Sequence, residues 1–258
     1  TNKIFNADEK YEGLKIGTTS WIEFIQEDNF GNLIIHTRDA LYLYNFTEEK
    51  LIEITTIELK NNVVSISVSD NDKKTYLATE NEIYSYDGSA FTTLSVQKIL
   101  TKKNTTIKKI LVIEDELWII TTDNKVWISN IKNNALVGWR TFSEVFNGEK
   151  TLIDPSLLHK TDKNTVWMGS RSEGVLIANI KTKVVKKSST IYHPNALKKK
   201  FVLSFYTGYN NITWIGVSGG GVSKYDQNVT QFGLWRNETV SGKAQPDNMI
   251  LSMYSEND

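Results

Sequence analysis

The stretch TWIGVSGGGVSKYD, residues 213–226, contains three successive glycines that form either a phosphate-binding loop or a tight turn. A phosphate loop needs the spacing GxxxxGK(S/T) or GxGxxG between a strand and a helix, so that backbone N–H groups and a helix N-terminus face the phosphate. Neither spacing occurs here, and the residues after the glycines alternate in polarity as a strand does. The glycines therefore predict a hairpin turn between two strands.

The same arrangement recurs four more times upstream. Each copy has a short apolar strand, a small polar turn and a second alternating strand. The copies are LIIHTRDALYLYN from residue 33, TYLATENEIYSYD from residue 75, LWIITTDNKVWISN from residue 117 and VWMGSRSEGVLIAN from residue 166. The second residues of the five stretches are Ile34, Tyr76, Trp118, Trp167 and Trp214, at intervals of 42, 42, 49 and 47 residues. A near-constant interval indicates a repeated structural unit.

Further strand candidates flank each copy. An apolar segment such as VVSISV, residues 63–68, precedes the copy, and one such as FTTLSV, residues 91–96, follows it. A unit of four antiparallel strands that repeats about every 40 to 50 residues is typical of a β-propeller, whose blades bury their faces against one another. We predict an all-β fold, a single β-propeller domain or segment over residues 1–258. Its five full repeats are expected at about 21–62, 63–105, 106–150, 151–198 and 199–246.

The two ends of the chain predict a fragment of a larger propeller. Residues 247–258 resemble the start of a further repeat. In the fifth repeat the tryptophan, Trp214, follows the start of the first strand, Val202, and the same distance would place the tryptophan of the further repeat beyond Asp258. Apolar residues at 4–5 and 14–16 are candidates for the outer strand of a blade whose other strands come from elsewhere. We therefore expect parts of an incomplete blade at the ends.

Composition excludes several classes of partner. Thirty Lys and Arg residues balance thirty Asp and Glu residues, so there is no global attraction to nucleic acid or to an anionic membrane, and we expect no nucleic-acid partner. Cysteine is absent, which excludes disulfides and thiolate metal sites. The histidines His36, His159 and His193 lie in three different units. We expect neither a metal site nor a cofactor.

The repeats resemble a known family. The strings WIGVSGGGVSKYD, VWMGSRSEGVLIAN and LWIITTDNKVWISN, with DNMILSMYSEND at the end of the chain, are similar to two-component regulator propeller repeats. The first two units depart from that pattern because Ile34 and Tyr76 replace the tryptophan, and Val217 replaces the usual threonine.

This resemblance implies a periplasmic, extracytoplasmic sensor module of a hybrid two-component system. Such a module would recognise polysaccharide-derived oligosaccharides and signal to a histidine kinase elsewhere in the parent protein, so this chain itself would not be an enzyme. The resemblance also implies a homodimer in the parent protein and membrane contact only through segments absent from this chain.

Two groups of side chains are candidates for named roles. Trp118, Trp167 and Trp214 recur in one strand register and are predicted to form the core between blades. The turns between second and third strands should share one rim with the segments that join blades. Six residues on that rim are predicted to line a ligand site, with tryptophan stacking on a sugar ring. They are Arg38, Asp39, Arg171, Glu173, Trp235 and Arg236.

Two other functions stay open. A propeller can serve as a scaffold that binds another protein through its rim, and it can hold a lyase or glycosidase site in its central channel. No GxSxG, HExxH or paired-carboxylate motif favours an enzyme. Carboxylates from different blades can still converge in space without any signal in the sequence.

Overall fold

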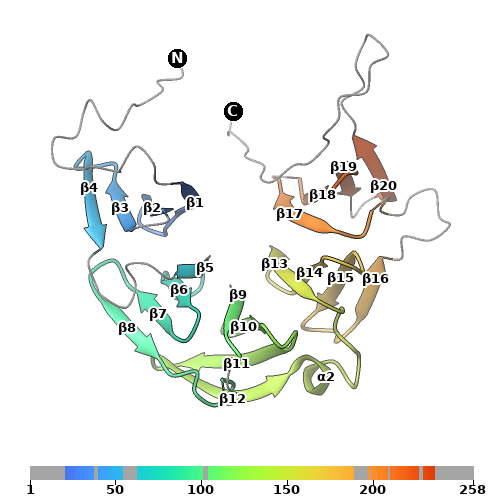
Figure 1. The fold of residues 1–258 in the computed structure, drawn as a ribbon, viewed down its shortest axis with the longest axis horizontal. Helices are drawn as coiled ribbons and strands as arrows, with labels where there is room; N and C mark the ends of the chain where they lie inside the picture. The colour runs from blue at the N-terminus through green and yellow to red at the C-terminus, as the bar shows by residue number, and fades with distance from the viewer. Residues whose placement is uncertain are drawn as a thin grey trace, which may run out of the picture. The chain divides into compact units, whose positions relative to one another are not determined.

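The computed structural model describes residues 21–37, 40–54, 63–100, 104–188, 197, 199–208, 210–226 and 229–235. Within these ranges the chain forms five four-stranded antiparallel sheets and one short helix, α2 (Phe142–Val145), as Figure 1 shows. The strands of each sheet lie in chain order. Such sheets are the blades of a β-propeller, which confirms the predicted fold class.

The strand bounds are as follows. The first sheet contains β1 (Ile22–Glu27), β2 (Asn32–Thr37), β3 (Leu41–Asn45) and β4 (Lys50–Ile54). The second contains β5 (Val63–Val68), β6 (Thr75–Thr79), β7 (Ile83–Tyr86) and β8 (Phe91–Leu94). The third contains β9 (Ile107–Ile113), β10 (Glu116–Thr121), β11 (Val126–Lys132) and β12 (Ala135–Thr141). The fourth contains β13 (Pro155–Asp162), β14 (Thr165–Ser170), β15 (Val175–Asn179) and β16 (Val185–Ser188). The fifth contains β17 (Val202–Thr207), β18 (Ile212–Val217), β19 (Gly221–Asp226) and β20 (Val229–Trp235).

Residues 4–5, 14–16 and 247–258, which we expected to form parts of a further blade, lie outside the described residues. In the described ranges, no helix has the length and apolar character needed to span a membrane.

The chain divides into two compact units, the first with the first and second sheets and the second with the third, fourth and fifth. In the first unit, Ile34 and Leu41 of the first sheet are buried with Leu77 and Tyr84 of the second. These side chains project from facing sheet surfaces because alternate residues of a strand point to the same side. Blade-to-blade contact therefore forms the apolar core of this unit.

The second unit contains two such interfaces. Between the third and fourth sheets, Trp118 is fully buried beside the rings of Phe142 and Phe146, which come from α2 and its C-terminal end. Between the fourth and fifth sheets, Trp167 is fully buried and meets the rings of Phe205 and Tyr225 edge-on. Each tryptophan thus faces the sheet that follows its own in the chain.

Hydroxyl side chains close four of the five turns between second and third strands. Thr37, Thr79 and Ser170 accept backbone N–H groups of their turns through their hydroxyl oxygens, and Thr121 donates its hydroxyl to Oδ1 of Asp123 within its turn. The fifth turn begins at Val217, which has no hydroxyl. A turn without that support depends on backbone conformation alone.

The three glycines supply the backbone conformation that this turn needs. Gly219 and Gly221 have φ angles of 63° and 76°, in the left-handed region that glycine adopts without strain. A Cβ on Gly220 would lie 2.7 Å from Cγ2 of Val217, so no side chain fits there. The glycine run is a hairpin turn between β18 and β19, as predicted.

A β-bulge recurs at the same place in the first strand of every sheet. The pairing register shifts after the first residue of β1, β5, β9, β13 and β17. The bulged residues are Glu23, Val64, Lys108, Ser156 and Leu203. Bulges redirect side chains at strand ends and are common beside functional sites.

Candidate ligand-binding rim

In the second unit, backbone hydrogen bonds bring the turns between second and third strands together with the segments that precede the first strands. The N–H groups of Thr122, Arg171 and Ser218 donate to the carbonyl oxygens of Thr106, Asp154 and Phe201 at 2.8, 3.4 and 2.9 Å. The same bond thus recurs in all three sheets. We call this surface the loop rim: turns 122–125, 171–174 and 218–220 with segments 104–106, 152–154 and 199–201.

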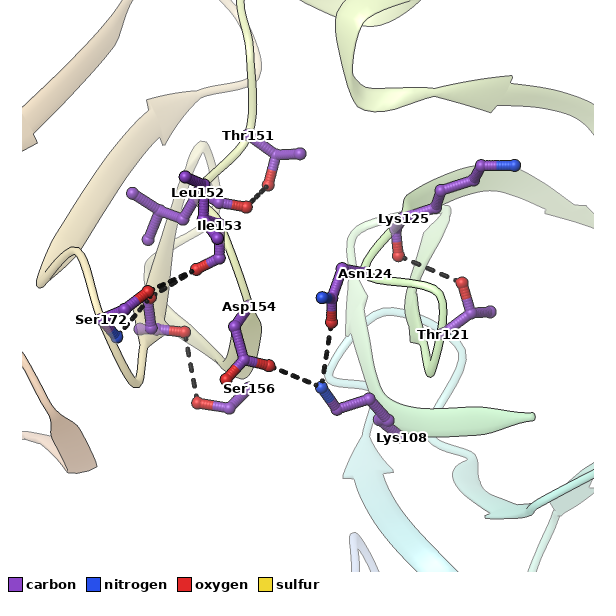
Figure 2. Close-up of polar contacts among 12 residues, drawn as sticks. Lys108, Thr121, Asn124, Lys125, Thr151, Leu152, Ile153, Asp154, Ser156 and Ser172 are labelled. Carbon is purple, nitrogen blue, oxygen red and sulfur yellow. Dashed lines mark hydrogen bonds and ion pairs between the residues drawn. The ribbon is translucent and has the colours of Figure 1, made fainter. Parts of the chain in front are cut away.

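A polar bridge joins the third and fourth sheets at the loop rim (Figure 2). Lys108, the bulged residue of β9, places its Nζ atom 3.1 Å from Oδ1 of Asp154 and 3.3 Å from Oδ1 of Asn124. The ion pair is partly exposed, so we expect its contribution to stability to be at most about 1 kcal/mol. Its main consequence is geometric: the bulge directs Lys108 toward the neighbouring sheet.

The turn after β14 is fastened to the segment before β13. The Ser170 hydroxyl is fully buried, donates to the carbonyl oxygen of Ile153 at 2.6 Å and accepts the N–H groups of Ser172 and Glu173, each at 3.0 Å. The N–H of Ile153 in turn donates to the Glu173 carboxylate at 2.5 Å. Glu173, a predicted ligand contact, therefore already has a structural partner within the rim.

Replacing Ser170 with alanine should lower the free energy of unfolding by about 1–3 kcal/mol, because buried hydrogen-bonding groups lose their partner. Urea titration followed by circular dichroism measures the change. The matched control is Ser172→Ala, the same chemical change at an exposed neighbour, which should alter stability by less than about 0.5 kcal/mol. Equal losses for the two variants would contradict the role given to Ser170.

Exposed apolar and basic side chains lie next to each other on the loop rim. The Arg171 guanidinium lies 5.9 Å from the ring centroid of Phe201, a cation–π contact across the fourth and fifth sheets. Phe201 is 38% exposed and Ile153 is 66% exposed. Lys199 and Lys200 are also exposed. Such a surface can pack against the apolar face of a sugar and offer N–H donors to its oxygens.

The acidic groups of the loop rim have partners of their own. Asp123 accepts the Thr121 hydroxyl at 2.6 Å and pairs with Lys125 at 3.3 Å. Burial raises the pKa of Asp123, but these hydrogen bonds and the nearby ammonium hold it below its usual range. The carboxylate is therefore ionised at neutral pH and turned toward the protein's own groups.

The structure brings together two of the six predicted rim residues, Arg171 and Glu173. Arg38, Asp39 and Arg236 lie outside the described residues, and Trp235 ends β20 with its side chain outside them. Three further rim residues, Lys108, Asp154 and Phe201, were not predicted from the sequence. No sequence signal marks the bulge that redirects Lys108, and Asp154 is distant from it in the chain.

The tryptophans predicted as core differ in burial. Trp118 and Trp167 are fully buried, whereas Trp214 is half-buried. Trp214 lies next to Ile215, which packs against the fourth sheet, so the pleat turns Trp214 to the other side of the fifth sheet. Among the described residues, no group of three or more His, Asp or Glu side chains is placed to hold a metal ion.

Comparison with known proteins gives similarity in structure alone. No protein-family model and no curated protein matches the sequence. The extracellular domain of BT3049 from B. thetaiotaomicron, described as a hybrid two component system, aligns over 81% of this chain and 29% of its own, with 16% identity and a TM-score of 0.57. The extracellular domain of BT4673 from the same organism aligns over 92% of this chain and 36% of its own, with 13% identity and a TM-score of 0.52. It is described as a hybrid two component system in that structure and as a one component system in another.

A propeller from an unrelated setting is equally similar. The β-propeller domain of Cps50 (Swd1) from Myceliophteria thermophila aligns over 84% of this chain and 73% of its own, with 8% identity and a TM-score of 0.58. At identities this low, the structural similarity shows only that the chain shares a fold with these proteins. A fold does not determine a function. The chain spans about a third of the length of the two B. thetaiotaomicron domains.

Proposed function

We propose that this chain is part of the extracytoplasmic, periplasmic sensor region of a hybrid two-component system, where it recognises oligosaccharides derived from polysaccharides. The observation that carries the proposal is the loop rim of the second unit, where the guanidinium of Arg171 lies over the exposed ring of Phe201 and where Ile153 is also exposed. Apolar surface next to a planar donor suits a sugar, which has one apolar face and many hydroxyl groups.

The similar extracellular domains support the same role, since two of them are described as belonging to hybrid two component systems. The role of this chain is then binding, and catalysis belongs to the histidine kinase of the parent protein. A ligand can signal only if it binds two arrangements of the parent with unequal affinity. We expect those arrangements to differ in how the propeller packs against a second copy of the parent.

Calorimetric titration of the purified chain against defined neutral and acidic oligosaccharides tests the proposal. One class of sugar should bind, and at a hundredfold excess over its Kd it should stabilise the fold by about 2.7 kcal/mol. Arg171→Met should weaken that binding about tenfold or more, because it removes a charge-assisted hydrogen bond. Lys163→Met is the control: Lys163 is exposed on the β13–β14 turn, at the opposite end of its strands from the loop rim.

Two outcomes would reject the proposal. If no sugar in the panel binds while the chain stays folded, the rim is not a sugar site. The alternative of a scaffold that binds another protein through its rim then remains. If a sugar is cleaved and its products are released, the chain is an enzyme and the binding role is wrong.

A further inference from the structure

One lysine occupies a position in the first strands that is neutral in every other sheet. Lys109 follows the bulged residue of β9 and pairs directly with Ile120. The residues in the same register, after the bulges of β1, β5, β13 and β17, are Phe24, Ser65, Leu157 and Ser204. The fold therefore does not need a charge at this position, and Lys109 calls for a functional explanation.

The side chain of Lys109 points toward the fourth sheet. Directly opposed residues of antiparallel strands share a face, so Lys109 lies on the same face as Ile120. Ile120 packs with Leu158 and Met168 of the fourth sheet. Lys109 thus lies between two blades near the loop rim, adjacent in the chain to Lys108, whose ammonium reaches that rim.

Among the described residues, none is a hydrogen-bond or ion-pair partner of the Lys109 ammonium. The nearby rim carboxylates are committed elsewhere: Asp154 to Lys108, Asp123 to Lys125 and Glu173 to the N–H of Ile153. The side chain is only partly exposed, and burial lowers the pKa of its ammonium. Withdrawing a cation from water without a counter-charge destabilises the free protein.

Exposed basic groups lie on the same rim, where the fourth and fifth sheets meet. Arg171, Lys199 and Lys200 are exposed on the loop rim, and none of them makes an ion pair within the described part of the chain. Their charges raise the local concentration of an anion at the rim. An incoming anionic group would supply the counter-charge that Lys109 lacks.

We propose that Lys109 binds an anionic group of the ligand, a carboxylate or a sulfate ester on a sugar, so that the rim selects acidic over neutral oligosaccharides. This inference rests on the proposed function, which it narrows to a class of sugar. The ammonium of Lys109 donates to the anion, while Arg171 and the lysines of segment 199–201 provide further positive charge.

Calorimetric titration with four probes tests this inference: digalacturonate for the carboxylate, a sulfated heparin-derived disaccharide for the sulfate ester, maltotriose as a neutral sugar, and inorganic sulfate. At least one acidic sugar should bind at least tenfold more tightly than maltotriose. Lys109→Met should remove that preference, whereas Lys109→Arg should retain most of it. Without ligand, Lys109→Met should melt at the same or a higher temperature, because it removes an unpaired charge and keeps the side-chain volume.

The outcomes separate this inference from the proposed function. Tight binding of maltotriose without preference for either acidic sugar would overturn the inference and leave the sugar-sensing role standing. Failure of all three sugars would overturn that role. In that case, the anion site is still supported if inorganic sulfate binds and Lys109→Met abolishes sulfate binding. The anion site is rejected if sulfate does not bind, or if it binds the variant as tightly as the wild type. Unchanged binding of an acidic sugar by Lys109→Met also overturns it.

Discussion

Replacing Trp167 with alanine is expected to lower the free energy of unfolding by about 3–5 kcal/mol. The indole is fully buried between the fourth and fifth sheets, where it contacts Phe205 and Tyr225 edge-on and lies in one cluster with Val202 and Ile215. Truncation removes the apolar area and leaves a cavity between two rigid sheets, which cannot collapse easily onto it. Urea unfolding followed by circular dichroism, which does not depend on the tryptophan signal, measures the loss.

Trp214→Ala is the matched control for this prediction. Trp214 has the same repeat position but is half-buried, on the side of the fifth sheet away from the fourth. The loss of stability should therefore be clearly smaller than for Trp167→Ala, since less apolar area is removed from contact. If the two variants lose the same amount, packing between sheets is not what the repeated tryptophan contributes.

The repeat interval alone was enough to predict the sheets. Alternation at period two follows from the pleat, and Ile34, Trp118 and Trp167 return in one register because each packs against the sheet that follows its own. The glycine turn was predicted as well, because a phosphate loop requires a spacing that the chain lacks. These features are local, or they repeat, so the sequence carries them directly.

The candidate site was predicted only in part, because its contacts join distant residues through backbone geometry. Arg171 and Glu173 were assigned to the rim. The partner of Glu173, the N–H of Ile153, lies in the segment before β13, the first strand of the same sheet. Lys108 and Asp154 meet only because a bulge redirects one and an inter-blade segment carries the other. A bulge is one extra residue in one strand of a pair, and its position cannot be predicted from the alternation of polar and apolar residues.

A half-buried histidine shows the same limit of sequence reasoning. The sequence predicted that His159 is not a metal ligand, but it gave no indication of what the side chain contacts. Its contacts belong to another sheet. Its Nε2 atom lies 2.8 Å from the Thr207 hydroxyl, which is 3.0 Å from the hydroxyl of Thr213, and its ring stacks on Phe205. Burial lowers the pKa of His159 to about 4, and the neighbouring charge of Lys160 lowers it further in the same direction.

This environment predicts a loss of stability in mild acid. The unfolded chain binds a proton at His159 below its ordinary pKa of about 6.5, whereas the folded chain does so only below about 4. The contribution is therefore full above pH 6.5, falls as the pH decreases from 6.5 to 4 and is constant below 4. At about 1.4 kcal/mol per pH unit, the loss over this window is at most about 3 kcal/mol.

The difference in free energy of unfolding between the wild type and His159→Gln isolates this effect, because every other titrating group, including His36, is common to both proteins. Glutamine keeps a hydrogen-bonding group near Thr207 and does not titrate in this range. Across pH 7 to 4, the wild type should lose up to about 3 kcal/mol more than the variant. Two results would contradict this prediction: parallel stability curves for the two proteins, or an NMR titration of the His159 ring with a midpoint near its ordinary pKa. Either would show that the imidazole remains in contact with water and that the hydroxyls of Thr207 and Thr213 do not hold it neutral.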